Sequence, residues 1–157
     1  MKRKPDIDFT VVRTDSLPKD ECREVHHLFQ QAYQDANAAY LEKSFSTLGY
    51  LALAKVRQKL VGFAVADTLR TPLPRLDGDQ TVVLAGISCV DSDYRRMGLF
   101  SRLETMAASA GGLLKPNIRV LACGRMAHPP VFGFSAGRLR LFPSPACLCQ
   151  AGIKRWD

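Results

Sequence analysis

Two arginines and a glycine stand directly after a long apolar run and form the clearest candidate for a binding site in this sequence. The run covers residues 81–90, and Arg95, Arg96 and Gly98 follow it after a short polar turn. The apolar spacing beyond Gly98 predicts a helix that begins here. The first N–H groups of a helix have no partners within it, and the helix dipole adds partial positive charge. These residues therefore predict a site for an anion such as a phosphate group.

The glycine gives such a site access, and the arginines give it charge. Because Gly98 has no Cβ atom, a phosphate can approach its backbone closely. Arg95 and Arg96 raise the local positive potential. A plain strand-to-helix turn with solvated arginines has the same composition, but the buried strand that precedes this turn favours the phosphate site.

The elements that must position this turn follow from the apolar periodicity of the rest of the chain. Helical spacing indicates three helices, and Asp15 or Ser16 is expected to cap the first of them. A strand, a helix and a strand in succession imply a parallel pair at 81–90 and 118–123. The predicted elements are a strand at 7–12, a helix with Val25, Leu28, Phe29, Ala32, Tyr33 and Ala36 on its apolar face, a helix at 37–48, antiparallel strands at 50–56 and 60–66, a loop or hairpin tip at 70–80, the strand at 81–90, a helix with Leu99, Leu103, Met106 and Ala110 on its apolar face, the strand at 118–123, and a short hairpin of 138–142 with 146–150.

The segment VDSDYRRMGLF at residues 90–100 resembles motif A of the GNAT superfamily of acyl-CoA N-acyltransferases. The signature of that motif is Arg or Gln, two residues, Gly, one residue, then Gly or Ala, and Arg95 and Gly98 match it. Phe100 stands where a small residue is usual, and Ser92 stands where a proline is common. The order of the predicted elements through residue 123 also resembles this family.

The resemblance implies a fold and a donor substrate. The implied fold class is α/β (α+β), with a mixed, mostly antiparallel sheet flanked by helices and a splayed parallel strand pair at its centre, in a single domain over residues 1–157. The implied donor is acyl-CoA, with acetyl-CoA favoured. Its pantetheine arm is expected to pair with the strand end around Cys89 and Val90, where a backbone N–H also holds the oxyanion. Its pyrophosphate is expected on the backbone amides of Arg96, Met97, Gly98, Leu99, Phe100 and Ser101.

The implied activity is an N-acetyltransferase reaction, in which an amine of a small molecule or a protein attacks the thioester carbonyl directly. A base removes the amine proton and an acid protonates the leaving thiolate. The tyrosine that the family often places beyond the fifth strand is absent, with Phe132 in that neighbourhood, and the motif strand has no glutamate base. Three alternatives stay open: proton transfer through water, His128 as an unusual acid, and a domain that binds CoA without catalysis.

Composition and charge limit the classes of partner. The chain has 157 residues, of which 46% are hydrophobic and 24% charged, as in a soluble globular protein. Its formal charge of +7 favours anionic partners and argues against polycationic acceptors such as aminoglycosides or polyamines. A nucleic-acid-binding module is the rival from another class, but the arginines are scattered and lack interleaved aromatic residues. The weak C-terminal strands could pair across a homodimer.

The cysteines and histidines predict neither disulfides nor a metal site. Five cysteines, an odd count, indicate reduced thiols in the cytoplasm, with Cys89 buried in its strand. No run approaches the roughly 18 apolar residues of a membrane span. His26 and His27 are neighbours on a helix and point about 100° apart, so they cannot share one metal ion. Cys147 and Cys149 lack the second ligand pair of a zinc site.

Overall fold

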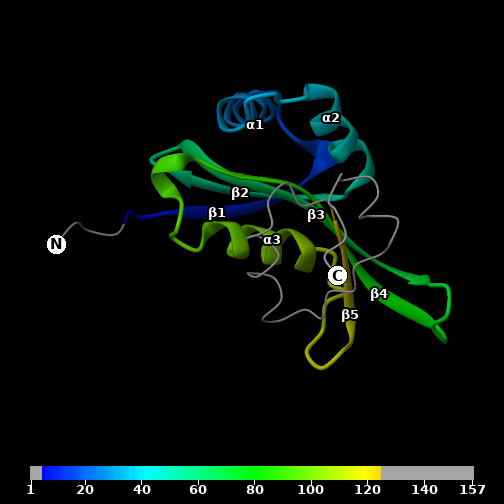
Figure 1. Ribbon diagram of the computed structural model, residues 1–157. Coiled ribbons are helices and arrows are strands. Elements are labelled where there is room, and N and C mark those ends of the chain that lie inside the picture. Colours follow the sequence, from blue (N-terminus) through cyan, green and yellow to red (C-terminus); the bar gives the residue numbers. More distant parts are fainter. Residues whose placement is uncertain (1–4, 125–157) are drawn as a thin grey trace, which may run out of the picture.

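The computed structural model describes residues 5–124, which form a five-stranded sheet with helices on both faces (Figure 1). The strands are β1 (Asp8–Arg13), β2 (Tyr50–Val56), β3 (Lys59–Pro72), β4 (Asp79–Val90) and β5 (Val120–Gly124), and they lie in sequence order across the sheet. Strands β1 to β4 are antiparallel, whereas β4 and β5 are parallel. The predicted α+β fold class with a mixed, mostly antiparallel sheet is therefore confirmed, but among the described strands the parallel pair lies at the edge of the sheet and not at its centre.

Some predictions concern residues after 124 and lie outside the described residues. These are the hairpin of 138–142 with 146–150, His128, Phe132, and the cysteine pair Cys147 and Cys149. Within residues 5–124, no helix is long and apolar enough to cross a membrane.

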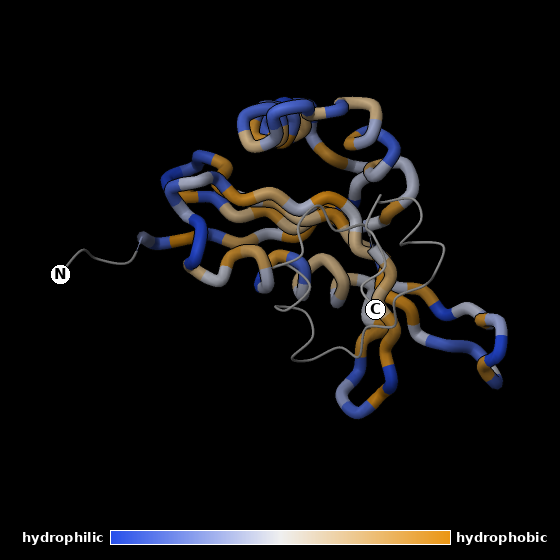
Figure 2. Tube along the Cα trace, viewed as in Figure 1, coloured by the Kyte–Doolittle hydropathy of each residue, from blue (hydrophilic) through white to orange (hydrophobic). Residues whose placement is uncertain are grey.

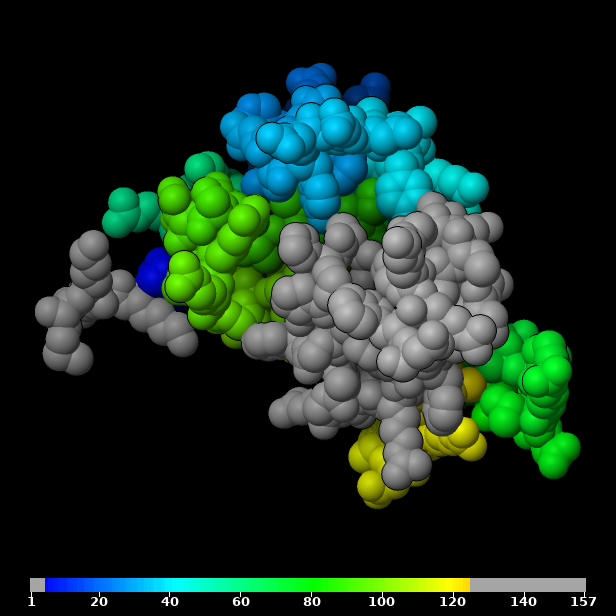
Figure 3. Space-filling view, viewed as in Figure 1, coloured from blue at the N-terminus to red at the C-terminus, as the bar shows by residue number. Residues whose placement is uncertain are grey.

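Each face of the sheet is covered by its own apolar layer. Helices α1 (Lys19–Ala32) and α2 (Ala38–Thr47) cover one face, and α3 (Leu99–Ser109) covers the other (Figure 1). Apolar colouring follows the central strands, while much of α1 is hydrophilic (Figure 2). The β3–β4 hairpin projects from the molecule (Figure 3), and its strands stay paired up to Pro72↔Asp79, so the tip covers residues 73–78 and is shorter than the predicted segment 70–80. The largest fully buried side chains are Phe63, Leu41, Leu51, Leu53, Leu103, Val25, Val61 and Val65.

The helix ends differ in part from the sequence predictions. The predicted cap of α1 by Asp15 or Ser16 is wrong, because Pro18 occupies the N-cap position. Asp15 instead pairs with Arg13, and the Ser16 hydroxyl donates to the Arg13 carbonyl, both around the short 3-10 turn η1 (Thr14–Ser16). Proline suits a helix start because it has no N–H to leave unpaired. The start of α2 is as predicted, and the Asn37 side chain accepts hydrogen bonds there.

The apolar face of α3 is also shifted from its prediction. Leu99 and Leu103 are buried as expected, but the buried face continues through Ala107 and Ala108. Met106 is only half-buried, and Ala110 is exposed just beyond the helix. Small residues allow α3 to pack closely on the sheet, which apolar periodicity alone does not reveal.

A β-bulge divides β4 into two halves. The register of β3 with β4 runs from Gly62↔Val90 to Ala64↔Ser88 and resumes at Ala66↔Ala85, so β4 has one extra residue. Gly86 lies in this bulge. A Cβ atom on Gly86 would stand 2.5 Å from Leu48 Cδ1 and 2.9 Å from the Val65 carbonyl oxygen. Glycine is therefore required here by the close approach of α2 and β3.

We expect Gly86→Ala to lower the free energy of unfolding by about 1–3 kcal/mol, because the added methyl group overpacks the bulge against backbone that cannot yield. Urea denaturation of the wild type and the variant measures this change. Gly111→Ala is the matched control: its Cβ would meet only the Tyr50 ring, at 3.3 Å. An equal loss in both variants would contradict the close-packing explanation.

Candidate functional site

The turn between β4 and α3 is built by hydrogen bonds around Asp91. Its N–H donates to the Val61 carbonyl at 2.9 Å, which ties the end of β4 to β3. Its carboxylate accepts from the Asp93 N–H at 3.0 Å and caps the 3-10 turn η2 (Ser92–Tyr94). Lys59 lies 3.5 Å from the same carboxylate. The turn is thus held firmly to the hairpin before α3 begins.

Helix α3 begins directly after Gly98, with open N–H groups at its first turn. Gly98 occupies the N-cap position with φ 77°, in the left-handed region that favours glycine. The first helical hydrogen bond runs from the Arg102 N–H to the Gly98 carbonyl at 3.2 Å. The N–H groups of Leu99, Phe100 and Ser101 therefore have no partner within the helix. A Cβ atom at Gly98 would meet no described atom within 4 Å, so the surroundings of Gly98 itself are open.

Three arginines surround this helix start. Arg95 and Arg96 are exposed in the turn before α3 rather than in the helix. The Arg95 Nε donates to the Val90 carbonyl at 3.3 Å, and Arg102 lies over the Phe9 ring, 3.8 Å from its centroid. Sequence reasoning missed Arg102, although its place one turn after Gly98 is a usable signal. A shallow pocket of about 160 Å³ beside the turn is lined by Pro5, Ile7, Phe9, Met97, Gly98, Leu99 and Arg102.

The second half of β4 offers backbone groups at its outer edge. The Asp91–Val61 hydrogen bond fixes the alternation of the antiparallel ladder, so Cys89 faces β3 whereas Ser88 and Val90 face away from it. The described pairing with β5 ends at Ala85↔Gly124 and does not reach them. Of the two residues expected to meet the pantetheine arm, Val90 therefore has its N–H and C=O turned to this edge, whereas Cys89 does not. Ser88 also turns its N–H and C=O to this edge.

Tyr33 reaches the same edge from the end of α1. Its hydroxyl donates to the Ser88 carbonyl at 3.0 Å, and its ring lies against Phe29 with 5.1 Å between centroids. Burial raises the pKa of Tyr33, so its hydroxyl keeps its proton at neutral pH. The sequence analysis placed Tyr33 only on an apolar helix face. No pattern along the chain indicates that this residue meets Ser88.

Glu104 approaches Ser88 from the α3 side of the sheet. The Ser88 hydroxyl donates to Glu104 Oε1 at 3.0 Å. Burial raises the pKa of Glu104, while this hydrogen bond lowers it by a smaller amount. Sequence reasoning missed this pair, because the only glutamate it sought was one on the strand itself.

Cys89 is a core residue, as the sequence predicted. It is 4% exposed, and its Sγ lies 3.8 Å from the Leu28 carbonyl oxygen. Burial raises the pKa of the Cys89 thiol to about 11, so it stays protonated and is a poor nucleophile at neutral pH. His128, the acid considered from the sequence, lies outside the described residues.

Solved acetyltransferase structures share the fold of this chain. A ribosomal-protein-alanine N-acetyltransferase from Brucella melitensis biovar Abortus 2308 is 16% identical, with a TM-score of 0.58 over 88% of this chain and 95% of that one. The aminoglycoside N-acetyltransferase AAC(6')-Iy with a CoA-linked bisubstrate analog is 12% identical, with a TM-score of 0.57 over 88% and 98%. An aminoglycoside acetyltransferase from an uncultured soil metagenomic sample, in complex with sisomicin, is 12% identical, with a TM-score of 0.54 over 84% and 85%.

These likenesses confirm the GNAT resemblance at the level of the fold. No protein-family model and no curated protein sequence matches the chain. At identities of 12–16%, the likeness shows the fold and does not identify an acceptor for this chain.

The buried Glu104 carboxyl predicts a pH dependence of stability. Its pKa is raised above the ordinary value of 4.5, so the folded state binds this proton more tightly than the unfolded chain does. The free energy of unfolding should therefore fall as the pH rises through the ordinary value and on through the raised one. We expect Glu104→Gln to lack this decline, measured as the difference between the two proteins in urea denaturation from about pH 4 to pH 7.

Ser88→Ala tests the cause of that decline. It removes the hydrogen bond that favours the charged Glu104 carboxylate, so the decline should extend to higher pH. A pH dependence identical in the wild type and Glu104→Gln would contradict the assignment.

Proposed function

We propose that this chain is an N-acyltransferase of the GNAT fold, which moves an acetyl or short acyl group from acyl-CoA to an amine. The observation that carries the proposal is the left-handed Gly98 before the open N–H groups of Leu99, Phe100 and Ser101, at the end of a buried strand. A pyrophosphate would accept hydrogen bonds from these groups and from the amides of Arg96 to Gly98. Arg95, Arg96 and Arg102 supply the compensating charge.

The outer edge of β4 is the proposed track of the pantetheine arm. Amide groups of the arm would pair with the outward backbone groups of Ser88 and Val90, as an added strand would. The thioester carbonyl would then lie near the outward N–H of one of these residues. That N–H is the proposed oxyanion donor, in place of the Cys89 N–H, which faces β3.

Tyr33 is the proposed acid for the leaving thiolate. The amine attacks the thioester carbonyl, its proton passes to water, and collapse of the intermediate expels the CoA thiolate. The Tyr33 hydroxyl stands at the same strand edge and keeps its proton at neutral pH, which are the two properties that an acid needs. His128 remains the alternative acid, and binding of CoA without catalysis remains the second candidate function.

The acceptor is proposed to be a primary amine on a small molecule or a protein. The charge of +7 disfavours polycationic acceptors, because they would be repelled by the protein surface. Cys22 and Cys89 form no disulfide among the described residues, which suits a reducing cytoplasmic setting.

We expect acetyl-CoA and CoA to bind the wild type and to bind Gly98→Asp at least about 100-fold more weakly, because a carboxylate in the phosphate site repels the pyrophosphate. Isothermal titration calorimetry at fixed ionic strength measures both affinities. Gly98→Asn adds nearly the same bulk without charge, so its affinity for acetyl-CoA and CoA should fall by less.

Gly78→Asp is the matched control for backbone strain. Gly78 has φ 70° and an equally open surrounding, but it lies in the β3–β4 hairpin. CoA binding should be unchanged in this variant. Absence of binding to the folded wild type would overturn the acyl-CoA proposal and direct the search to nucleic acid.

We expect Tyr33→Phe to lower kcat by about 10²-fold with little change in the KM for acetyl-CoA, because the proton is donated only as the thiolate leaves. Thiol release with a panel of primary amines measures both parameters. His128→Gln is the competing variant. A loss of kcat in His128→Gln but not in Tyr33→Phe would assign the acid to His128, and CoA binding without thiol release for any amine would favour the silent binding domain.

A further inference from the structure

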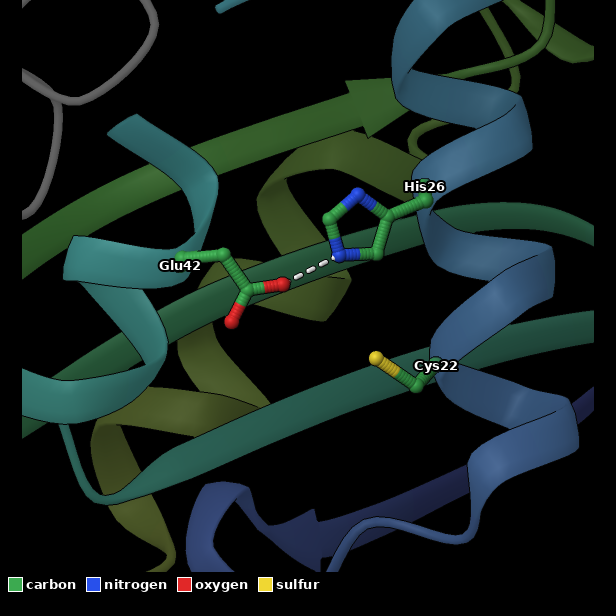
Figure 4. A group of neighbouring side chains, drawn as sticks. All are labelled: Cys22, His26 and Glu42. Atoms are coloured by element: carbon green, nitrogen blue, oxygen red, sulfur yellow. Dashed lines mark hydrogen bonds and ion pairs between the residues drawn. The ribbon is translucent and has the colours of Figure 1, made fainter. Parts of the chain in front are cut away.

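A thiol, an imidazole and a carboxylate meet between α1 and α2, in the helical layer on the opposite face of the sheet from α3 (Figure 4). Cys22 and His26 lie one turn apart on the same face of α1, and Glu42 reaches them from α2. One ligand atom from each side chain lies within 4.8 Å of the other two. Figure 4 shows all three side chains pointing into the space between the helices.

The contact between His26 and Glu42 does not explain why the Cys22 side chain points toward them. His26 Nε2 lies 2.5 Å from Glu42 Oε1, and the Phe45 ring stands edge-on to the imidazole at 6.3 Å. The half-buried Cys22 thiol makes no hydrogen bond to any residue that the structure describes, yet it points at this pair. A thiol directed at an imidazole and a carboxylate is the ligand arrangement of a metal site.

We propose that Cys22, His26 and Glu42 form a zinc site that joins α1 to α2, with a water molecule as the fourth ligand. Sulfur, nitrogen and oxygen are the three donor types that zinc takes in proteins, whereas magnesium and calcium require oxygen donors alone. The thiolate and the carboxylate neutralise the two positive charges of the ion. Binding breaks the Cys22 S–H bond and releases that proton to the buffer.

The geometry needs only side-chain movement to accept the ion. Bonds of about 2.0–2.3 Å to a tetrahedral zinc place the ligand atoms about 3.3–3.7 Å apart. The Cys22 sulfur lies within 4.8 Å of the other two ligand atoms and so needs at most a small approach, and the His26–Glu42 pair must open by about 1 Å. The Glu42 side chain is 59% exposed, so it is free to adjust and leaves a solvent-facing position for water.

The sequence analysis predicted no metal site because it paired His26 with His27. His27 is exposed and points away from the cluster, as its place on the helix requires. The ligand partners are instead Cys22, one turn earlier, and Glu42, which only the packing of α2 on α1 brings near.

The test measures binding of Zn²⁺, added as its chloride, to the full-length chain. We expect one zinc per chain after dialysis, measured by elemental analysis, with release of at least one proton. Co²⁺ in the same site should show a near-ultraviolet thiolate-to-cobalt charge-transfer band. In Cys22→Ser, zinc affinity should fall by at least about 100-fold and the band should disappear, because a direct ligand is lost.

Three variants control the assignment. His27→Gln changes the neighbouring imidazole and should retain zinc, whereas His26→Gln should lose it. A double change of Cys147 and Cys149 to Ser removes two cysteines that are not part of the proposed site, and this variant should also retain zinc. Unchanged binding in folded Cys22→Ser, or loss of binding in the double variant with retention in Cys22→Ser, would overturn the proposal and leave only the His26–Glu42 ion pair.

Discussion

The structure depends on the unequal pairing of the two halves of β4. From Thr81 to Ala85 this strand pairs on both edges, with β3 and with β5. After the bulge at Gly86 the described pairing is with β3 alone, and Ser88 and Val90 turn backbone groups outward. Backbone N–H and C=O groups at such an edge require partners. Tyr33 and Arg95 each satisfy one carbonyl, and the outward N–H groups are the ones proposed to meet the pantetheine arm.

The same strand also sets the position of the proposed anion site. Because β4 is tied to β3 up to the Asp91–Val61 hydrogen bond, the following turn is fixed where it leaves the sheet. Gly98, in the left-handed region, then redirects the chain into α3, whose buried leucines lie against β2, β3 and β4. The helix start and the strand edge are thus parts of one rigid connection. This connection would fix the proposed sites of the pyrophosphate and of the thioester relative to each other.

Local patterns in the sequence predicted most of this framework, and non-local contacts account for what they missed. The apolar runs at 50–56 and 81–90 identify their strands because every residue in them is buried or half-buried. The Gly98 turn was predicted because glycine and arginine after a buried strand are typical of a helix start that binds an anion. The hydrogen bond from Tyr33 to Ser88 joins residues 55 positions apart, and that from Ser88 to Glu104 depends on how α3 crosses the sheet. No periodicity records such pairings.

Helix α1 connects the proposed zinc site, at His26, with Tyr33 at the outer edge of β4. His26 and Tyr33 lie about 10 Å apart along its axis, at 1.5 Å per residue; the helix is continuous through Ala32, and Tyr33 is its extended C-cap residue. A continuous helix moves as a rigid body, so any displacement of α1 relative to the sheet also displaces the Tyr33 hydroxyl relative to Ser88. Contacts that hold α1 to α2 near His26 therefore limit the same motion that would carry Tyr33 away from the strand edge. Lys55 on β2 adds to this restraint, because its ammonium group pairs with Glu21, in the first turn of α1, at 3.0 Å.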